Sequence, residues 1–258
     1  MDHTAVLALV DRELREEARP DAPDAHVERC GHVVRQTAPA HGWNGVLWSR
    51  LDEARADAAI AGQIAHFTRL GRAFEWKVYG HDRPADLGRR LVAAGFVPGP
   101  EETLMVAEAA RLDLDPDLPD GVRVLPVTDA SGVELVAEVH REAFDADSAW
   151  LRDQLLARLA ADPDTVVAVV ALADEAPVSA ARMELVPGTS FAGLWGGGTV
   201  RAWRGRGIYR ALVAHRARAA VRRGYVHLQV DASAQSRPIL QRLGFAPLTT
   251  TTPYVYTP

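Results

Sequence analysis

Residues 196–212, GGGTVRAWRGRGIYRAL, decide the fold class. They follow an apolar run and pass through a basic turn, Arg204-Gly-Arg-Gly207, into an Arg/Ala-rich stretch that predicts a helix to about Arg223. Glycines allow a tight turn and leave successive N–H groups unobstructed, and with the positive end of the helix dipole those donors form an anion site. Arg204 and Arg206 add positive charge, so we predict a phosphate or pyrophosphate ligand. The alternative is an ordinary Gly-Arg surface turn.

Two familiar phosphate-binding patterns do not fit this turn. A Walker loop needs Gly-Lys-Ser/Thr, whereas Ile208 and Tyr209 follow the second glycine. A dinucleotide fold places its glycine turn after the first strand of a βαβ unit, with an acid about 20 residues further on. This turn instead follows several predicted strands late in the chain. The sequence therefore predicts a phosphate-bearing ligand other than a simple nucleotide.

The segments on either side of the turn predict alternating strands and helices. The expected order is β-α-α-β-β-β-α-β-α-β, which is typical of an α/β or α+β domain with a mixed sheet. The predicted strands cover residues 122–127, 165–172, 178–185, 191–200 and 225–230, with a last strand ending at 256, and the predicted helices cover 129–144, about 151–159, 207–223 and 237–243.

The chain divides at a segment rich in proline and aspartate. Residues 111–121, RLDLDPDLPDG, show no sustained periodicity and predict a linker. We therefore predict domains over 1–110 and 122–258. In the first domain, helices are expected in the first 20 residues and around 51–71, a strand at 74–79, and no assignment emerges for 20–45.

The two parts share a local pattern. In each, a strand is followed by Arg-Pro, a short helix and a Leu with Gly-Phe four residues later: Leu91 with Gly95-Phe96, and Leu240 with Gly244-Phe245. The shared order predicts a diverged internal duplication.

The turn in its context resembles the GNAT superfamily of acyl-CoA-dependent N-acyltransferases. Arg204-Gly-Arg-Gly-Ile-Tyr209 follows a β-meander and precedes a helix, a strand and Leu-Gly-Phe, a similarity that covers roughly residues 121–258. The resemblance implies a GNAT-like fold whose mixed, mostly antiparallel sheet is flanked by helices. The first half resembles a degenerate, partial copy without a glycine turn, as in tandem forms of the family.

The resemblance also implies a reaction and a set of binding residues. Acetyl-CoA would be the co-substrate, and its acetyl group would pass to an amine of a small molecule. The pantetheine arm would lie between two splayed strands against Thr199 and Val200. The pyrophosphate would lie against the backbone of Arg204, Gly205, Arg206, Gly207, Ile208 and Tyr209.

Three positions depart from the family pattern. Tyr209 replaces the usual Gly or Ala, so we expect its side chain to point away from the phosphates, toward the sheet or the substrate cleft. Ser233 matches a position that often holds a cofactor-binding Asn. Leu240 matches the usual general-acid Tyr and carries no hydroxyl, which leaves Tyr209 as a hypothetical substitute acid.

Candidate catalytic residues are few. The strand 191–200 contains no carboxylate, so Glu184 on the neighbouring predicted strand is the candidate base, and the alternative is a solvated strand glutamate. The histidines are expected to be structural: His140, His215 and His227. Gly196–Gly198 would admit a ligand close to the backbone or would pack beneath a bulky neighbour such as Trp195 or Trp203. The arginines later in the predicted helix, among them Arg216, are expected on a solvated face.

Composition narrows the class of protein. Of 258 residues, 29 are basic and 34 acidic, and 29 − 34 = −5 argues against a nucleic-acid partner. No apolar run is long enough to predict a membrane span, and the N-terminal segment does not resemble a signal peptide. The single cysteine, Cys30, excludes an intrachain disulfide and favours the cytoplasm, and it lacks the neighbours of a metal site. The sequence leaves open whether the protein forms a homodimer.

Two rival functions accompany the acyltransferase prediction. One is an acyl-CoA-binding sensor that has lost its chemistry, suggested by Leu240 and the missing strand carboxylate. The other is a protein-lysine or N-terminal acetyltransferase, which would need an open peptide groove.

Overall fold

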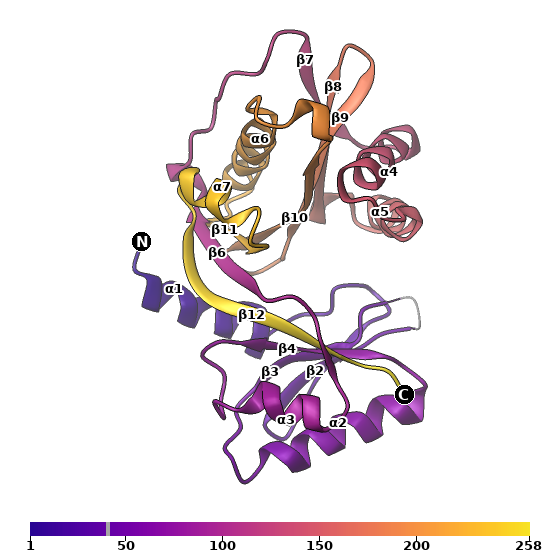
Figure 1. Cartoon of the computed structure of the whole chain (residues 1–258), viewed down its shortest axis with the longest axis vertical. Helices are drawn as coiled ribbons and strands as arrows, with labels where there is room; N and C mark the ends of the chain where they lie inside the picture. The colour runs from indigo at the N-terminus through magenta and orange to yellow at the C-terminus, as the bar shows by residue number, and fades with distance from the viewer. Residues whose placement is uncertain (40–41) are drawn as a thin grey trace. The chain divides into compact units, whose positions relative to one another are not determined.

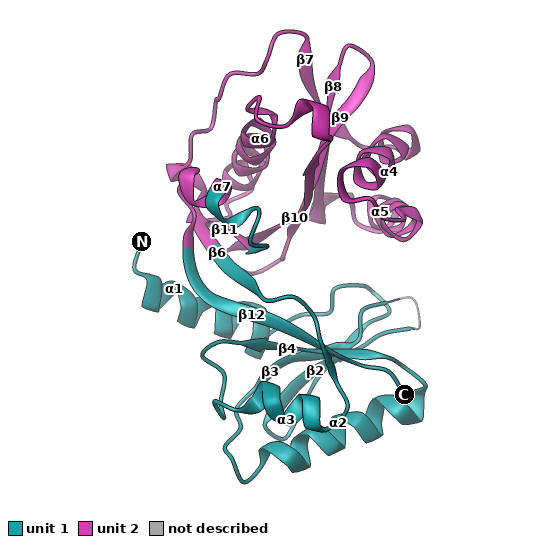
Figure 2. Cartoon of the chain, viewed as in Figure 1, with its two compact units in different colours: residues 1–105, 231–238, 247–258 teal, residues 106–230, 239–246 magenta. Residues whose placement is uncertain are grey.

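The computed structural model describes residues 1–39 and 42–258 (Figure 1). The chain forms two compact units (Figure 2). Unit 1 contains residues 1–105, 231–238 and 247–258, and unit 2 contains residues 106–230 and 239–246.

Residues 122–256 have the predicted order of elements, and most of them form unit 2. Its strands are β7 (Val122–Val127), β8 (Val166–Ala173), β9 (Ala176–Leu185), β10 (Phe191–Thr199) and β11 (His227–Ala232), the last of which ends in unit 1. They lie in the order β11-β10-β9-β8-β7. The pairs β7–β8, β8–β9 and β9–β10 are antiparallel, whereas β10 and β11 run parallel.

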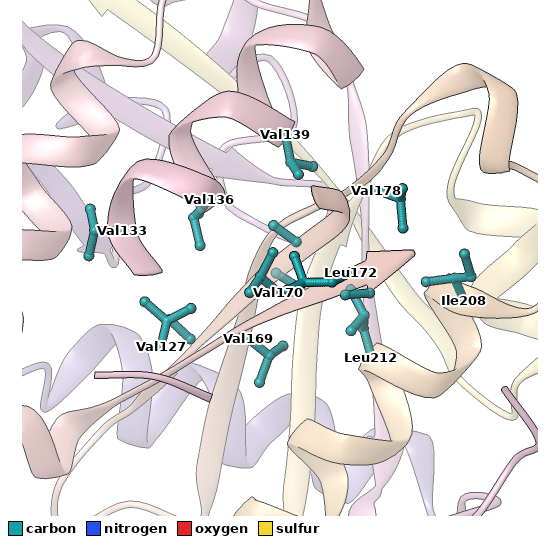
Figure 3. Packing of buried hydrophobic residues seen from close by; sticks show 14 of the residues in the cluster. Val127, Val133, Val136, Val139, Val169, Val170, Leu172, Val178, Ile208 and Leu212 are labelled. Atoms are coloured by element: carbon teal, nitrogen blue, oxygen red, sulfur yellow. The ribbon is translucent and has the colours of Figure 1, made fainter. Parts of the chain in front are cut away.

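Helices cover both faces of this sheet. Helices α4 (Ala130–Phe144) and α5 (Ala149–Ala161) pack together, with α4 on β9 and β10, and α6 (Ile208–Arg222) packs on the same strands from the other side (Figure 1). In Figure 3 the valines of α4 approach the strands from one side, and Ile208 and Leu212 approach from the other. β8 runs between these two layers, and its residues from Ala168 to Ala173 are buried, which explains its almost continuous β-branched and apolar sequence.

The helix ends follow from local sequence. An Oδ of Asp129 accepts a hydrogen bond from the Gly132 N–H at 2.9 Å, which caps α4. At the end of α6, Gly224 has a φ of 81°, and the Tyr225 N–H donates to the Ala220 carbonyl at 3.0 Å. A positive φ favours glycine, so Gly224 is suited to the end of this helix.

Unit 1 is a second α/β body built from both ends of the chain. Its strands β1 (His26–Cys30), β2 (Val33–Thr37), β3 (Gly45–Ser49), β4 (Phe74–Tyr79) and β12 (Ala246–Tyr256) lie in that order, and the short β5 (Val97–Pro98) pairs with β12. The strand β6 (Glu102–Glu108) is divided between the units. The helices are α1 (His3–Val10), a π-helical continuation over Asp11–Glu16, α2 (Ala56–Leu70), α3 (Leu87–Ala93) and the short α7 (Arg237–Arg242), which is also divided.

The two Leu…Gly-Phe segments have matching local geometry. Gly95 and Gly244 have φ values of 98° and 100°. In each segment the Phe N–H donates to the carbonyl of the Leu five residues earlier, at 3.0 Å, and both Leu side chains are fully buried. This agreement supports the internal duplication that the sequence pattern predicts.

The compact units do not coincide with the predicted domain ranges. The last strand, β12, was expected within 122–258, but its residues from Thr251 to Tyr256 pair antiparallel with β4 of unit 1. Residues 111–121 lie inside unit 2, where the Arg218 side chain bonds to Leu114 and Asp115. That the ranges 1–110 and 122–258 are two related copies of one fold stays a prediction. No helix in the described part of the chain is long and apolar enough to cross a membrane.

Candidate functional site

The strand β10 has an unpaired edge over its second half. Its parallel pairing with β11 extends from Phe191–His227 to Gly193–Gln229 and then stops, although β10 continues to Thr199. Within the described residues, 194–199 therefore have no strand on the β11 side. The opposite edge pairs with β9 but changes register between Trp195 and Gly198, where Gly196 has a φ of 57°. β10 thus separates from β11 next to a bulge, which leaves backbone groups available to an extended ligand.

The predicted glycine turn stands at the start of α6. Gly205 and Gly207 have φ values of 76° and 84°, so both positions favour glycine. Gly207 is the N-cap, and no side chain caps the first N–H groups of the helix. A Cβ on Gly205 would meet no atom within 4 Å. The turn therefore presents uncapped donors on an accessible surface, as an anion site requires.

The two arginines of the turn have different environments. The Nε of Arg204 donates to the Thr199 carbonyl at 2.9 Å and its Nη2 donates to the Ala143 carbonyl at 3.1 Å, so this side chain ties the turn to the ends of β10 and α4. Arg206 is exposed, and its guanidinium lies 4.5 Å from the Trp203 ring centre. Arg206 retains free donors, whereas Arg204 contributes mainly its charge.

Thr199 and Val200 differ in what their backbones can offer. The Val200 N–H already donates to the Val178 carbonyl of β9 at 3.0 Å. Because successive N–H groups of a strand point in opposite directions, the Thr199 N–H faces the unpaired edge. The Thr199 hydroxyl lies 2.8 Å from the Ser179 hydroxyl. Of the two residues expected to contact pantetheine, Thr199 has the suitable backbone orientation.

Each glycine of the bulge has a neighbour in its Cβ position. A Cβ on Gly197 would lie 2.8 Å from the Tyr209 ring, and one on Gly198 would lie 2.8 Å from the Phe144 ring. A Cβ on Gly196 would lie 3.0 Å from the Nη1 of Arg182. Packing beneath a bulky neighbour therefore explains two of the three glycines, but the neighbours are Tyr209 and Phe144 rather than Trp195 or Trp203.

Tyr209 points toward the sheet, as its position in the turn required. It shares one face of α6 with Arg216, which is 1% exposed, in contrast to the solvated face expected for it. The Nε of Arg216 donates to the Leu212 carbonyl and its Nη1 to the Arg182 carbonyl, both at 3.0 Å, while Nη2 has no partner. Burial lowers the pKa of Arg216 to about 10, and nearby Tyr209 opposes that shift. The sequence did not reveal this burial because small alanines surround Arg216 on α6.

Glu184, the candidate base, is ion-paired. Its two carboxylate oxygens lie 3.4 Å from guanidinium nitrogens of Arg182 and Arg158. It stands opposite Gly193 in the β9–β10 ladder. It is therefore near the bulge, but its carboxylate is already bound by two cations.

Ser233 and Leu240, the other two positions compared with the family pattern, lie in different units. Ser233 belongs to unit 1, where its hydroxyl contacts the Ser236 hydroxyl at 3.2 Å. Leu240 is fully buried in the core.

Two residues near the site were not predicted. His140 of α4 packs against Phe144, with the ring centres 4.8 Å apart and the planes tilted by 43°, and its Nδ1 is enclosed without a partner. Burial and the charge of Arg182 lower the pKa of His140 below its usual 6.5. Arg210 extends back over the turn, 3.9 Å from the Cβ position of Gly207. Its place three residues after the helix cap is the sequence signal that could have found it.

Unit 1 contains a similar strand separation that its own side chains occupy. Pairing of β3 with β4 ends at Val46–Trp76, although β3 continues to Ser49. The buried Arg15 donates to the Leu47 carbonyl at 3.2 Å and binds both carboxylate oxygens of Asp82 at 2.8 Å. Since no glycine turn follows β3, the site in unit 2 has no counterpart in unit 1 among the described residues.

The site can now be compared with known proteins. Residues 131–245 match the family model described as "Acetyltransferase (GNAT) family". These residues form a GNAT acetyltransferase domain. The matched range contains α4, the β10 bulge, the glycine turn and α6.

Solved structures show that the fold of the whole chain is shared. A GCN5-related N-acetyltransferase from Kribbella flavida is 19% identical with a TM-score of 0.69, covering 98% of this chain and 93% of that one. A tandem GNAT protein from the clavulanic acid biosynthesis pathway is 14% identical with a TM-score of 0.64, covering 93% and 85%. A functionally unknown conserved protein from Staphylococcus epidermidis is 14% identical with a TM-score of 0.70, covering 94% and 96%.

These comparisons confirm the GNAT fold, including the mixed sheet flanked by helices that the sequence predicted. The family match confirms a GNAT-type acetyltransferase domain over residues 131–245, and the fold shared with a tandem GNAT protein agrees with a second copy in the first half of the chain. No curated protein matches the sequence with significance.

Proposed function

We propose that this GNAT protein transfers an acetyl group from acetyl-CoA to the amine of a small molecule. The observation that carries the proposal is the unpaired edge of β10, which leads directly into the uncapped glycine turn of α6. An unpaired strand edge suits an amide-containing arm, and a helix N-terminus with neighbouring arginines suits its pyrophosphate. The single cysteine further supports a cytoplasmic location.

The residues divide the binding of acetyl-CoA between them. The Thr199 backbone would pair with the pantetheine arm, and the N–H groups of the turn from Gly205 to Tyr209 would bind the pyrophosphate. Arg206 and Arg210 are exposed cations beside the turn, so they can add charge-assisted bonds. Arg204 would act by fixing the shape of the turn.

The transfer itself requires positioning and three proton movements. The amine nitrogen attacks the thioester carbonyl carbon, the C–S bond breaks, and the sulfur leaves with the electron pair. The amine enters as an ammonium ion, loses one proton to a base and a second as the amide forms, and the departing sulfur takes up a proton. Backbone N–H groups on the unpaired edge of β10 would stabilise the oxyanion.

Two side chains near the bulge could accept the proton from the amine. Glu184 is the candidate from the sequence, but Arg158 and Arg182 bind its carboxylate. His140 carries a neutral ring at pH 7, because burial and Arg182 lower its pKa, and its enclosed Nδ1 has no partner. The two candidates predict different pH profiles.

Calorimetric titration with acetyl-CoA tests the proposal. We expect micromolar binding at one site per chain, since Arg15 fills the corresponding separation in unit 1. Gly207→Glu should abolish binding, because it places bulk and negative charge at the turn. Gly224→Glu is the matched control: Gly224 also has a φ near 80° but ends the same helix, so this variant should bind normally.

A folded wild-type protein that binds neither acetyl-CoA, CoA nor longer acyl-CoAs would contradict the proposal. Binding without acetylation of any amine would instead support an acyl-CoA sensor. The buried Leu240 in place of a general acid favours that second function.

A further inference from the structure

Among the described residues of unit 2, side chains leave one face of the β10 bulge open to an acceptor. On the α6 side, the Tyr209 ring occupies the space next to Gly197. On the α4 side, Phe144 covers Gly198, but Gly196 is exposed and its nearest neighbour is a guanidinium nitrogen of Arg182. An amine that reaches a thioester on the edge of β10 would therefore approach on the α4 side, beside Arg182.

Arg182 is a partly buried cation with unused donors. Its side chain is 12% exposed, and its one partner among the described residues is Glu184, 3.4 Å from Nε. Both Nη groups are left without an acceptor in the described structure. Burial lowers the pKa of Arg182, Glu184 opposes that shift, and the charge of Arg158 adds to it. An anion bound to the Nη groups would relieve this unfavourable situation.

Aromatic side chains line the same face. Trp195 stands directly opposite Arg182 in the β9–β10 ladder, and side chains of directly opposed residues share a face of the sheet. Trp195 is 38% exposed and Phe144 47%, so both rings are accessible on this face. Arg182 is thus a recessed cation with exposed aromatic rings next to it. His140, which packs against Phe144, is neutral at pH 7, so it adds no second positive charge beside Arg182.

We propose that the α4 side of the bulge is an acceptor subsite and that the acceptor is an amine that also carries a carboxylate, held by Arg182. A guanidinium binds a carboxylate through two parallel hydrogen bonds, which orients the amine as well as attracting it. Trp195 and Phe144 contact the apolar part of the acceptor. The inference rests on the proposed acetyl transfer and narrows its substrate to amino-acid-type molecules.

Matched acceptors test this inference. Amino acids, their amides and the corresponding carboxylate-free amines are compared by kcat/KM, with CoA release followed by a thiol reagent. We expect the carboxylate-bearing member of the preferred set to exceed its amide and its decarboxylated amine at least tenfold. Arg182→Met should remove that preference, Arg182→Lys should keep part of it, and neither should change the Kd for acetyl-CoA. Arg123→Met, at an exposed ion pair with Glu175, is the control.

Several outcomes would overturn the inference. One is equal or faster acetylation of carboxylate-free amines, and another is a carboxylate preference that survives Arg182→Met. If no amine is acetylated, binding of the amino-acid panel to the acetyl-CoA-loaded protein is measured by saturation-transfer NMR, and absence of Arg182-dependent binding overturns it. Failure of acetyl-CoA itself to bind is a separate result, which contradicts the proposed function.

Discussion

At the scale of single residues, the environment of His140 favours the neutral form of its ring. Its ring lies on the α4 side of the bulge, against Phe144 and within the field of Arg182. Burial and that positive charge both favour the neutral form, so its pKa lies below 6.5. The ring is therefore neutral at pH 7 and becomes protonated only as the pH falls through its lowered pKa.

We predict that His140→Gln lowers kcat and flattens the acid limb of the pH–rate profile. In the wild type, a neutral His140 can take the amine proton, and this capacity is lost as the pH falls through its lowered pKa and the ring charges. His215→Gln is the control, because burial also lowers the pKa of His215 but the residue lies on α6. A profile that keeps its acid limb in His140→Gln and loses it in Glu184→Gln would assign the proton to Glu184.

At the scale of elements, the bulge in β10 packs directly against the first turn of α6. The Tyr209 ring fills the space that a side chain at 197 would need. This contact gives Gly197 a structural role in addition to any role in ligand binding. It also explains how the turn accommodates a tyrosine where the family has Gly or Ala: the ring is accepted by a glycine on the neighbouring strand.

We predict that Gly197→Ala destabilises the protein by about 1–3 kcal/mol, because the new methyl group lies 2.8 Å from the Tyr209 ring. In a Tyr209→Ala background the same change should have little effect, since the neighbour is gone. Equilibrium urea unfolding measures the free energy of unfolding of the wild type, the two single variants and the double variant. Gly62→Ala, in α2 with no atom within 4 Å of the new methyl group, should stabilise by about 0.5–1 kcal/mol. An equal loss with and without Tyr209 would disprove the contact.

The elements also show what the sequence could predict. The order from β7 to β12, the cap at Asp129 and the helix-ending Gly224 follow from local patterns that tertiary contacts do not override. The strands β1 to β3 were not recognised, because they are five residues long and β1 and β2 carry buried or paired charges. Arg35, for example, is buried on β2 through bonds to Glu28 and Gln63. When the partners of such polar residues lie elsewhere in the chain, the local sequence predicts a loop instead of a strand.

The candidate site divides in the same way. The glycine turn was predictable, since its positive φ values and its place before α6 are properties of adjacent residues. His140 and Arg182 were not, since only the packing of α4 on β9 and β10 brings them to the bulge. Partners of this kind are set by tertiary contacts, which a local pattern does not contain.

At the scale of the whole molecule, the last strand, β12, lies next to β4 in the sheet that also contains β1, β2 and β3. Tyr256 pairs with Phe74 of β4, and its ring lies 5.3 Å from that of Phe96 and 5.9 Å from that of Phe74. The apolar cluster of unit 1 therefore contains residues from both ends of the sequence. Unit 1 is expected to depend on a segment more than 140 residues away along the chain.

We predict that Tyr256→Ala destabilises unit 1 by roughly 2–4 kcal/mol, since the ring packs in an aromatic cluster but is only partly buried. The loss should appear as faster amide hydrogen exchange in β4, at Phe74–Tyr79, because that strand loses the side-chain packing that holds its neighbour in register. Val255→Ala is the control: Val255 is the adjacent residue of β12 and is 40% exposed, so exchange in β4 should change little. Unchanged exchange in Tyr256→Ala would show that this ring does not hold β4 in register.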